Sequence, residues 1–190
     1  EVRLNHRGLT NHIFANLLGL APERMALAGR LLDAAPKMGE AGFKAALEKE
    51  NFDQNQIQIL VRLLNSDPTL RSDLEKVDNY KHLKSVLDGL SELGIGSYFR
   101  YEPSIMRGFM YYTGLVFEVY DLHPDNNRAL FGGGRYDDLV GMFGGKALPG
   151  VGFGMGDVTL RNFLETHKLL PELESPSGVY LAHLFDEQNL

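Results

Sequence analysis

The chain has 190 residues, of which 44% are hydrophobic and 23% charged, an ordinary composition for a globular protein of one large or two small domains. Its net charge of −6 disfavours a general nucleic-acid coating function, although a local basic patch for one RNA remains compatible with it. Because the chain has no cysteines, only scattered histidines, no membrane-length apolar run and no signal-peptide pattern, we expect no disulfide, metal site or membrane contact, and a cytoplasmic location.

The first part of the chain is predicted to leave a strand and enter helices. Residues 1–6 have strand character, and the helix that follows ends at Gly19. Pro22 then suits a first helical position, and a further helix is expected over 40–50.

Later helices carry clearer signals. Asp53 and Gln56 form the pattern of a capping box, and Asp67 with the proline after it opens a short helix. An apolar stripe over 83–93 stops at Gly94. Such stripes indicate core packing, so we expect one compact helical subdomain.

Beyond residue 94 the pattern returns to strands. Polar turns and hairpin-like spacing favour an antiparallel sheet. Its strands are expected over 97–101, 107–118, 129–131 and 151–155, followed by a helix over 157–166 that Asp157 caps and that turns Val158, Phe163, Leu164 and His167 inward.

The strand predicted over 107–118 has two unlike faces, because side chains alternate along a strand. One face carries Tyr112, Gly114, Val116, Glu118 and Tyr120, and the other Tyr111, Thr113, Leu115, Phe117 and Val119. A phenol, a bare glycine and a carboxylate on one face indicate that something polar lies against it.

The last strand has one face without side chains. Gly150, Gly152, Gly154 and Gly156 recur at period two, while Val151, Phe153 and Met155 fill the opposite face and are expected to anchor it in a core. Glycine weakens a strand, so this pattern indicates a close approach to the backbone, either by a flat ring such as a nucleobase or by a tightly packed neighbour. The triple glycine at 132–134 is compatible with an anion cradle or a tight turn.

Three ordered motifs resemble the histidyl-tRNA synthetase family. They are R-G-x-x-Y-Y-T-G-x-V-F-E from Arg107, G-G-R-Y-D from Gly133 and G-x-G-F-x-M-G from Gly150. The resemblance implies an α+β fold: a partial class II synthetase-like, mostly antiparallel sheet with an all-helical insertion. It divides the chain into core segments 1–20 and 95–168, a helical insertion 21–94, and 169–190 as a linker and first strand of an anticodon-binding-type domain.

The resemblance also implies a function and its residues. The family activates histidine with ATP, together with Mg²⁺, to histidyl-adenylate and transfers it to tRNA as a homodimer. Arg107 matches the arginine that acts on the α-phosphate and on the histidine carboxylate. The remaining matches are Tyr111, Tyr112 and Tyr136 for histidine, and Gly152, Gly154, Gly156 and Thr159 for ATP.

Two departures keep other functions open. Phe109-Met110 replaces the family's usual Leu-Asp, and Thr159 stands where the third motif places an arginine, which Arg161 cannot replace because it lies about 200° further round a helix. One alternative is a non-catalytic, histidine-sensing regulatory subunit of ATP phosphoribosyltransferase. Another is an unrelated glycine-rich nucleotide-binding enzyme. Since the chain begins at Glu1 within strand character, we interpret it as a piece of a longer protein that is inactive alone.

Overall fold

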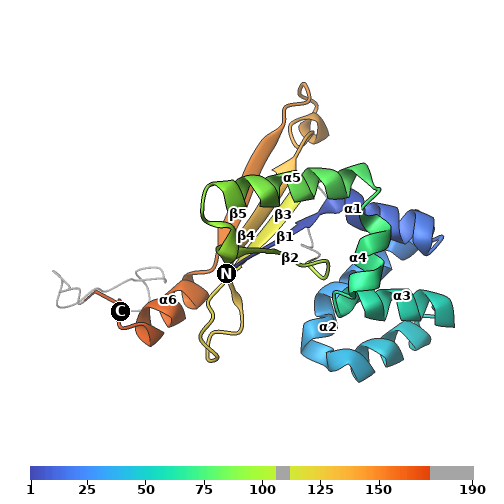
Figure 1. Ribbon diagram of the computed structural model, residues 1–190, viewed down its shortest axis with the longest axis horizontal. Coiled ribbons are helices and arrows are strands. Elements are labelled where there is room, and N and C mark those ends of the chain that lie inside the picture. The colour runs from blue at the N-terminus through green and yellow to red at the C-terminus, as the bar shows by residue number, and fades with distance from the viewer. Residues whose placement is uncertain (106–111, 172–190) are drawn as a thin grey trace, which may run out of the picture.

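The computed structural model describes residues 1–105 and 112–171 and centres on a sheet with the strand order β2-β1-β3-β4-β5 (Figure 1). Strand β1 pairs in parallel with β2, whereas all the other pairs are antiparallel. The predicted mostly antiparallel α+β fold is therefore confirmed. The strands are β1 Val2–His6, β2 Phe99–Tyr101, β3 Leu115–Tyr120, β4 Ala129–Tyr136 and β5 Gly150–Met155.

Helices lie around this sheet in three places. Helices α1–α4 gather beyond one end of it, α5 lies across one of its faces, and α6 projects beyond the opposite end (Figure 1). No helix within the described ranges is long and apolar enough to cross a bilayer. The helices are α1 Arg7–His12, the π-helix η1 Ile13–Leu17, α2 Pro22–Lys49, α3 Gln54–Leu64, α4 Pro68–Leu74, α5 Asp78–Glu92 and α6 Asp157–Thr166, with short 3-10 turns at Gly96–Tyr98 and Gly141–Phe143.

The local helix signals act as the sequence predicts. Gly39 has a φ of 70° and breaks α2 into two helical stretches, the second of which matches the helix predicted over 40–50. The Asp53 carboxylate accepts from the Gln56 backbone at 2.8 Å, while the Gln56 side chain accepts from the Asp53 backbone at 3.2 Å, which completes the capping box. Asp67 likewise accepts from the first turn of α4.

The main core lies among the helices. Leu9, Phe43, Leu60 and other apolar residues from α1 to α5 form one buried cluster. Helix α5 joins this cluster to the sheet, because Tyr80 packs edge-on against Tyr101 of β2 and His82 against His6 of β1. The face of β1 that bears Asn5 is directed away from α5, because side chains alternate along the strand.

The core prediction for β5 is wrong. Val151, Phe153 and Met155 are 68%, 63% and 49% exposed. Phe153 does meet Phe131 of β4, with ring centroids 5.8 Å apart, but these exposed fractions show that no helix of the described chain packs over the three side chains. The apolar face of β5 is therefore an open surface rather than an anchor.

Three boundaries also differ from the predictions. Among the described residues β3 begins at Leu115, later than predicted, and β4 extends to Tyr136, so that Gly132–Gly134 lie inside a strand rather than in a turn or an anion cradle. A side chain at Gly133 would collide with the carbonyl of Gly152, which explains glycine there. At α6 the N-cap is Gly156 rather than Asp157, and Val158 points outward.

Candidate functional site

Tyr112 lies in a small cluster on the sheet face opposite α5. Its side chain is 4% exposed and packs with Ile105 and Val116, with Tyr136 at the edge. A β-carbon added at Gly134 would lie only 2.7 Å from the Tyr112 ring, so the ring rests directly on β4. The glycine in β4 therefore provides the space that this tyrosine occupies.

Tyr136 covers part of the bare face of β5. A β-carbon at Gly150 would approach its ring to 2.5 Å, and one at Gly152 would be in ordinary contact with it at 3.4 Å. A β-carbon at Gly154 would meet no atom of the described residues within 4 Å. The neighbouring-strand interpretation thus holds for Gly150 and Gly152, whereas Gly154 offers an open, flat surface beside the two tyrosines.

A polar row leads across the same face toward Gly154. The register pairs Arg3 with Glu118, Glu118 with Gly132 and Gly132 with Gly154. Glu118 accepts a hydrogen bond from the Tyr120 hydroxyl at 2.6 Å, and the Arg3 guanidinium lies 3.9 Å from the centre of the Tyr120 ring. The sequence predicts something polar against this face of β3. Next to β1, that polar neighbour is Arg3 of the protein itself, which lies over Tyr120.

Arg135 does not join the tyrosines. It lies between Gly134 and Tyr136 in β4, so its side chain projects to the other face. Its Nε donates to Asp137 at 3.0 Å, and the same carboxylate accepts from the Thr113 hydroxyl at 2.7 Å. The Thr113 bond and then Arg135 lower the pKa of Asp137 below its ordinary value.

Thr159 is buried and bonded within the protein. Its hydroxyl lies 3.2 Å from the Leu130 carbonyl and 3.1 Å from the Gly156 carbonyl, and it ties α6 to β4. Arg161 pairs with Glu165 at 2.8 Å on the exposed side of the helix. Neither Thr159 nor Arg161 therefore supplies the cation that the third motif would place here.

Two predicted site residues, Arg107 and Tyr111, lie outside the described residues, as do Phe109 and Met110. Their described neighbours on either side are Ile105 and Tyr112, which pack in one cluster. The roles predicted for Arg107 and Tyr111 stay predictions.

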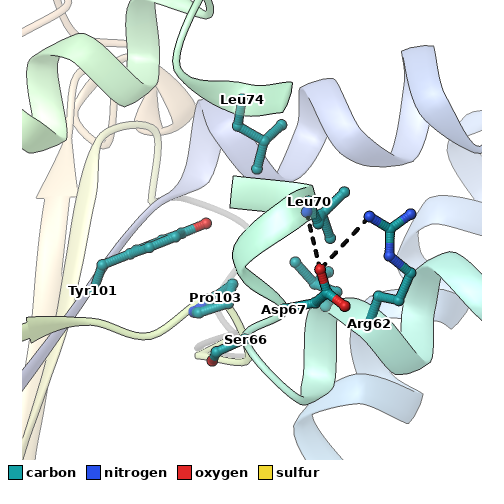
Figure 2. A pocket seen from close by; sticks show the side chains of 8 residues that line it. Arg62, Ser66, Asp67, Leu70, Leu74, Tyr101 and Pro103 are labelled. Atoms are coloured by element: carbon teal, nitrogen blue, oxygen red, sulfur yellow. Dashed lines mark hydrogen bonds and ion pairs between the residues drawn. The ribbon is translucent and has the colours of Figure 1, made fainter. Parts of the chain in front are cut away.

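A separate cavity lies between the helices and the sheet (Figure 2). Arg62 and Asp67, 3.7 Å apart, face one another on its helical side, while Tyr101 and Pro103 border it from the β2 side. Its volume of about 40 Å³ holds roughly three water molecules. It is too small for an amino acid or a nucleotide and lies apart from the tyrosines, so we do not assign it to the site.

Sequence reasoning missed two polar residues beside the tyrosine cluster. Asn5 and Glu102 are buried and hydrogen-bonded to the chain that enters this cluster. The strand end that contains Asn5 does not indicate this contact, because Pro103 and Ile105 lie about 100 residues away along the chain. Only the fold could reveal this contact.

Comparisons with known proteins identify the family of the chain. A family model described as histidyl-tRNA synthetase matches residues 1–158. The chain is 33% identical to the histidine–tRNA ligase of Leptospira biflexa over 98% of the chain and 43% of that protein. The histidyl-tRNA synthetase structure from Nostoc is 29% identical with a TM-score of 0.70, over 90% of this chain and 43% of that one.

A structure from Bacillus halodurans, described as an ATP phosphoribosyltransferase regulatory subunit/histidyl-tRNA synthetase, is 22% identical with a TM-score of 0.66. The match covers 85% of this chain and 43% of that one. At this identity it shows the shared fold alone. The chain spans less than half the length of the curated relatives it matches, and it belongs to the histidyl-tRNA synthetase family.

Proposed function

We propose that the complete protein containing this chain is a histidine–tRNA ligase, which activates histidine with ATP and transfers it to tRNA. The observation that carries the proposal is the placement of Tyr112 and Tyr136 over the glycines of β4 and β5, beside the open surface at Gly154. Membership of the family supports the same activity.

In this proposal the tyrosines recognise histidine. Tyr112 would face the imidazole, with Tyr111 and Tyr136 as further residues of the histidine site, and a phenol hydrogen bond distinguishes histidine from an apolar side chain of similar shape. Discrimination is strong because the wrong side chain leaves a buried polar partner unsatisfied.

The nucleotide would lie on the glycine strand. Gly154 leaves room for a planar ring at the backbone, and Gly152 and Gly156 flank it. Thr159 would line the site from the first turn of α6, where its hydroxyl is engaged with backbone carbonyls.

The reaction then needs little covalent help. A carboxylate oxygen of histidine attacks the α-phosphorus, the bond to pyrophosphate breaks, and negative charge builds on the phosphate oxygens. A planar, permanently charged guanidinium suits this charge and the carboxylate, so we assign this role to Arg107. Arg135 cannot share it from the opposite face while paired with Asp137.

Other components of the proposal follow from the activity. Mg²⁺ would accompany the phosphates of ATP and neutralise part of their charge. We also propose a homodimer acting in the cytoplasm.

Residues 21–94 would serve as the helical insertion near tRNA. They contain twelve acidic and ten basic residues, so a general basic surface does not supply that contact.

Exchange of labelled pyrophosphate into ATP tests the proposal. The complete protein should catalyse exchange with histidine and not with phenylalanine or glutamine. The 190-residue chain alone should not, because stabilising a triphosphate takes several cations and Arg107 is the one we assign here. Histidine-independent exchange, or none by the complete protein, would refute the ligase activity.

A second candidate is the regulatory subunit of ATP phosphoribosyltransferase. The observation that favours it is Thr159, which replaces a cation and bonds to the backbone instead. This candidate predicts histidine binding without exchange, so calorimetry with histidine beside the exchange assay separates the two functions.

A further inference from the structure

Asn5 is a buried polar residue of β1 that holds a segment outside the sheet. It is 2% exposed, and its amide nitrogen donates to the Ile105 carbonyl at 2.9 Å and to the Pro103 carbonyl at 3.1 Å. The same nitrogen lies 3.2 Å from the Thr10 hydroxyl, while the amide oxygen accepts from the His6 backbone at 2.8 Å. A buried amide is costly unless its groups are satisfied, so these contacts fix the side chain and its partners together.

The held segment, residues 102–105, follows β2 directly. Its start is tied to β1 by the Glu102 backbone N–H, which donates to the Leu4 carbonyl at 2.8 Å. The Glu102 carboxylate stiffens it further, accepting from the Ser104 hydroxyl at 2.7 Å and pairing with Arg100 at 3.3 Å. The bond from Asn5 to Ile105 ties the far end of the segment to the same strand.

Ile105 connects this tie to the proposed histidine pocket. Its side chain is buried in one cluster with Tyr112 and Val116. Val116 is the register partner of Asn5 on one neighbouring strand and of Gly134 on the other, so it lies between Asn5 and the glycine on which Tyr112 rests. Tyr112 itself rests on Gly134, which cannot give way because it is backbone.

Loss of the Asn5 amide would therefore release one wall of the pocket. The carbonyls of Pro103 and Ile105 would be left buried without this donor, and the segment would shift to satisfy them. Tyr112 would follow Ile105 because the two pack together, while Gly152 and Gly154 on β5 would not be affected.

We propose that Asn5 is a positioning residue for histidine binding, which holds Tyr112 in place through the 102–105 segment. This inference rests on the proposed function to the extent that Tyr112 contacts histidine. Asn5 itself touches no substrate in this scheme. Its effect should therefore appear in histidine affinity and not in ATP affinity.

Calorimetry on the complete protein tests the proposal, with histidine and ATP titrated separately. Asn5→Ala should raise the Kd for histidine about tenfold and leave the Kd for ATP within about twofold of the wild-type value. Asn5→Ser, which keeps one short donor, should lie between wild type and alanine. The matched control is Asn126→Ala, since Asn126 is also buried and donates to Asp121 at 2.7 Å, away from the tyrosines.

The outcomes separate the two proposals. Equal losses of histidine and ATP affinity, or an equal loss of histidine affinity in Asn126→Ala, would reduce Asn5 to a general stability residue. If Asn5→Ala does not fold, unchanged histidine affinity in folded Asn5→Ser would overturn the proposal. If the wild-type protein binds histidine without catalysing pyrophosphate exchange, the ligase function fails, but the affinities of the variants still decide the role of Asn5. If the wild-type protein binds no histidine, both the ligase function and the role of Asn5 fail.

Discussion

The helical region and the sheet differ in where their apolar side chains find partners. In α1–α5, Leu9, Phe43 and Leu60 bury one another within residues 7–92. On β5, Val151 and Phe153 are exposed, although they alternate with glycine as regularly as the apolar residues of a strand with one buried face. A helical stripe can be covered by the next helix along the chain, whereas a strand face needs a whole layer against it.

The difference predicts a large contrast in stability. Phe43→Ala should cost about 3–5 kcal/mol of unfolding free energy, because it removes a fully buried ring and leaves a cavity. Phe153→Ala should cost less than about 1 kcal/mol, because that ring is 63% exposed. Urea unfolding of the chain measures both, and comparable losses would mean that β5 belongs to the core after all.

The next largest effect is expected at Tyr112, which is buried on the sheet face opposite α5. Tyr112→Phe in the complete protein should weaken histidine binding by about 1–3 kcal/mol, because a polar partner in the pocket loses its phenol. Tyr98→Phe is the matched control, since Tyr98 lies exposed beyond α5. Calorimetry that finds the same histidine affinity in both variants would remove Tyr112 from the site.

The smallest effect concerns the attachment of α6. The Asn126 amide donates to the Asp121 carboxylate at 2.7 Å, and His167, at the end of α6, lies 2.8 Å from the same carboxylate. These hydrogen bonds, that of Asn126 most of all, lower the pKa of Asp121 to about 2. A depressed folded-state pKa stabilises the protein above the ordinary value of 3.8, and this contribution is lost as the pH falls from about 4 to about 2.

Urea midpoints of wild type and Asp121→Asn should therefore converge as the pH falls through this window. A difference that stays constant from pH 5 to pH 2 would show that the carboxylate does not hold its neighbours in the folded state.

Sequence reasoning succeeded where the deciding contacts are local. The capping box of Asp53 and the stop at Gly94 depend on residues within one or two turns, so the predicted helices were confirmed. The glycine face of β5 was also predicted, but its partial cover by Tyr136 depends on strand register, which the pattern does not encode. The exposed Val151 and the tie from Asn5 to Ile105 required the tertiary fold.

The central claim is that the open glycine surface of β5 receives the nucleotide. Gly154→Val tests it most directly, because a β-carbon there meets nothing within 4 Å in the described part of the chain and valine suits a strand, so the fold should stay intact. Gly89→Val in α5 is the control, since that position is equally open and lies on a helix away from the site. In the complete protein we expect Gly154→Val to abolish ATP binding measured by calorimetry and Gly89→Val to retain it; wild-type ATP affinity in a folded Gly154→Val variant would contradict the account.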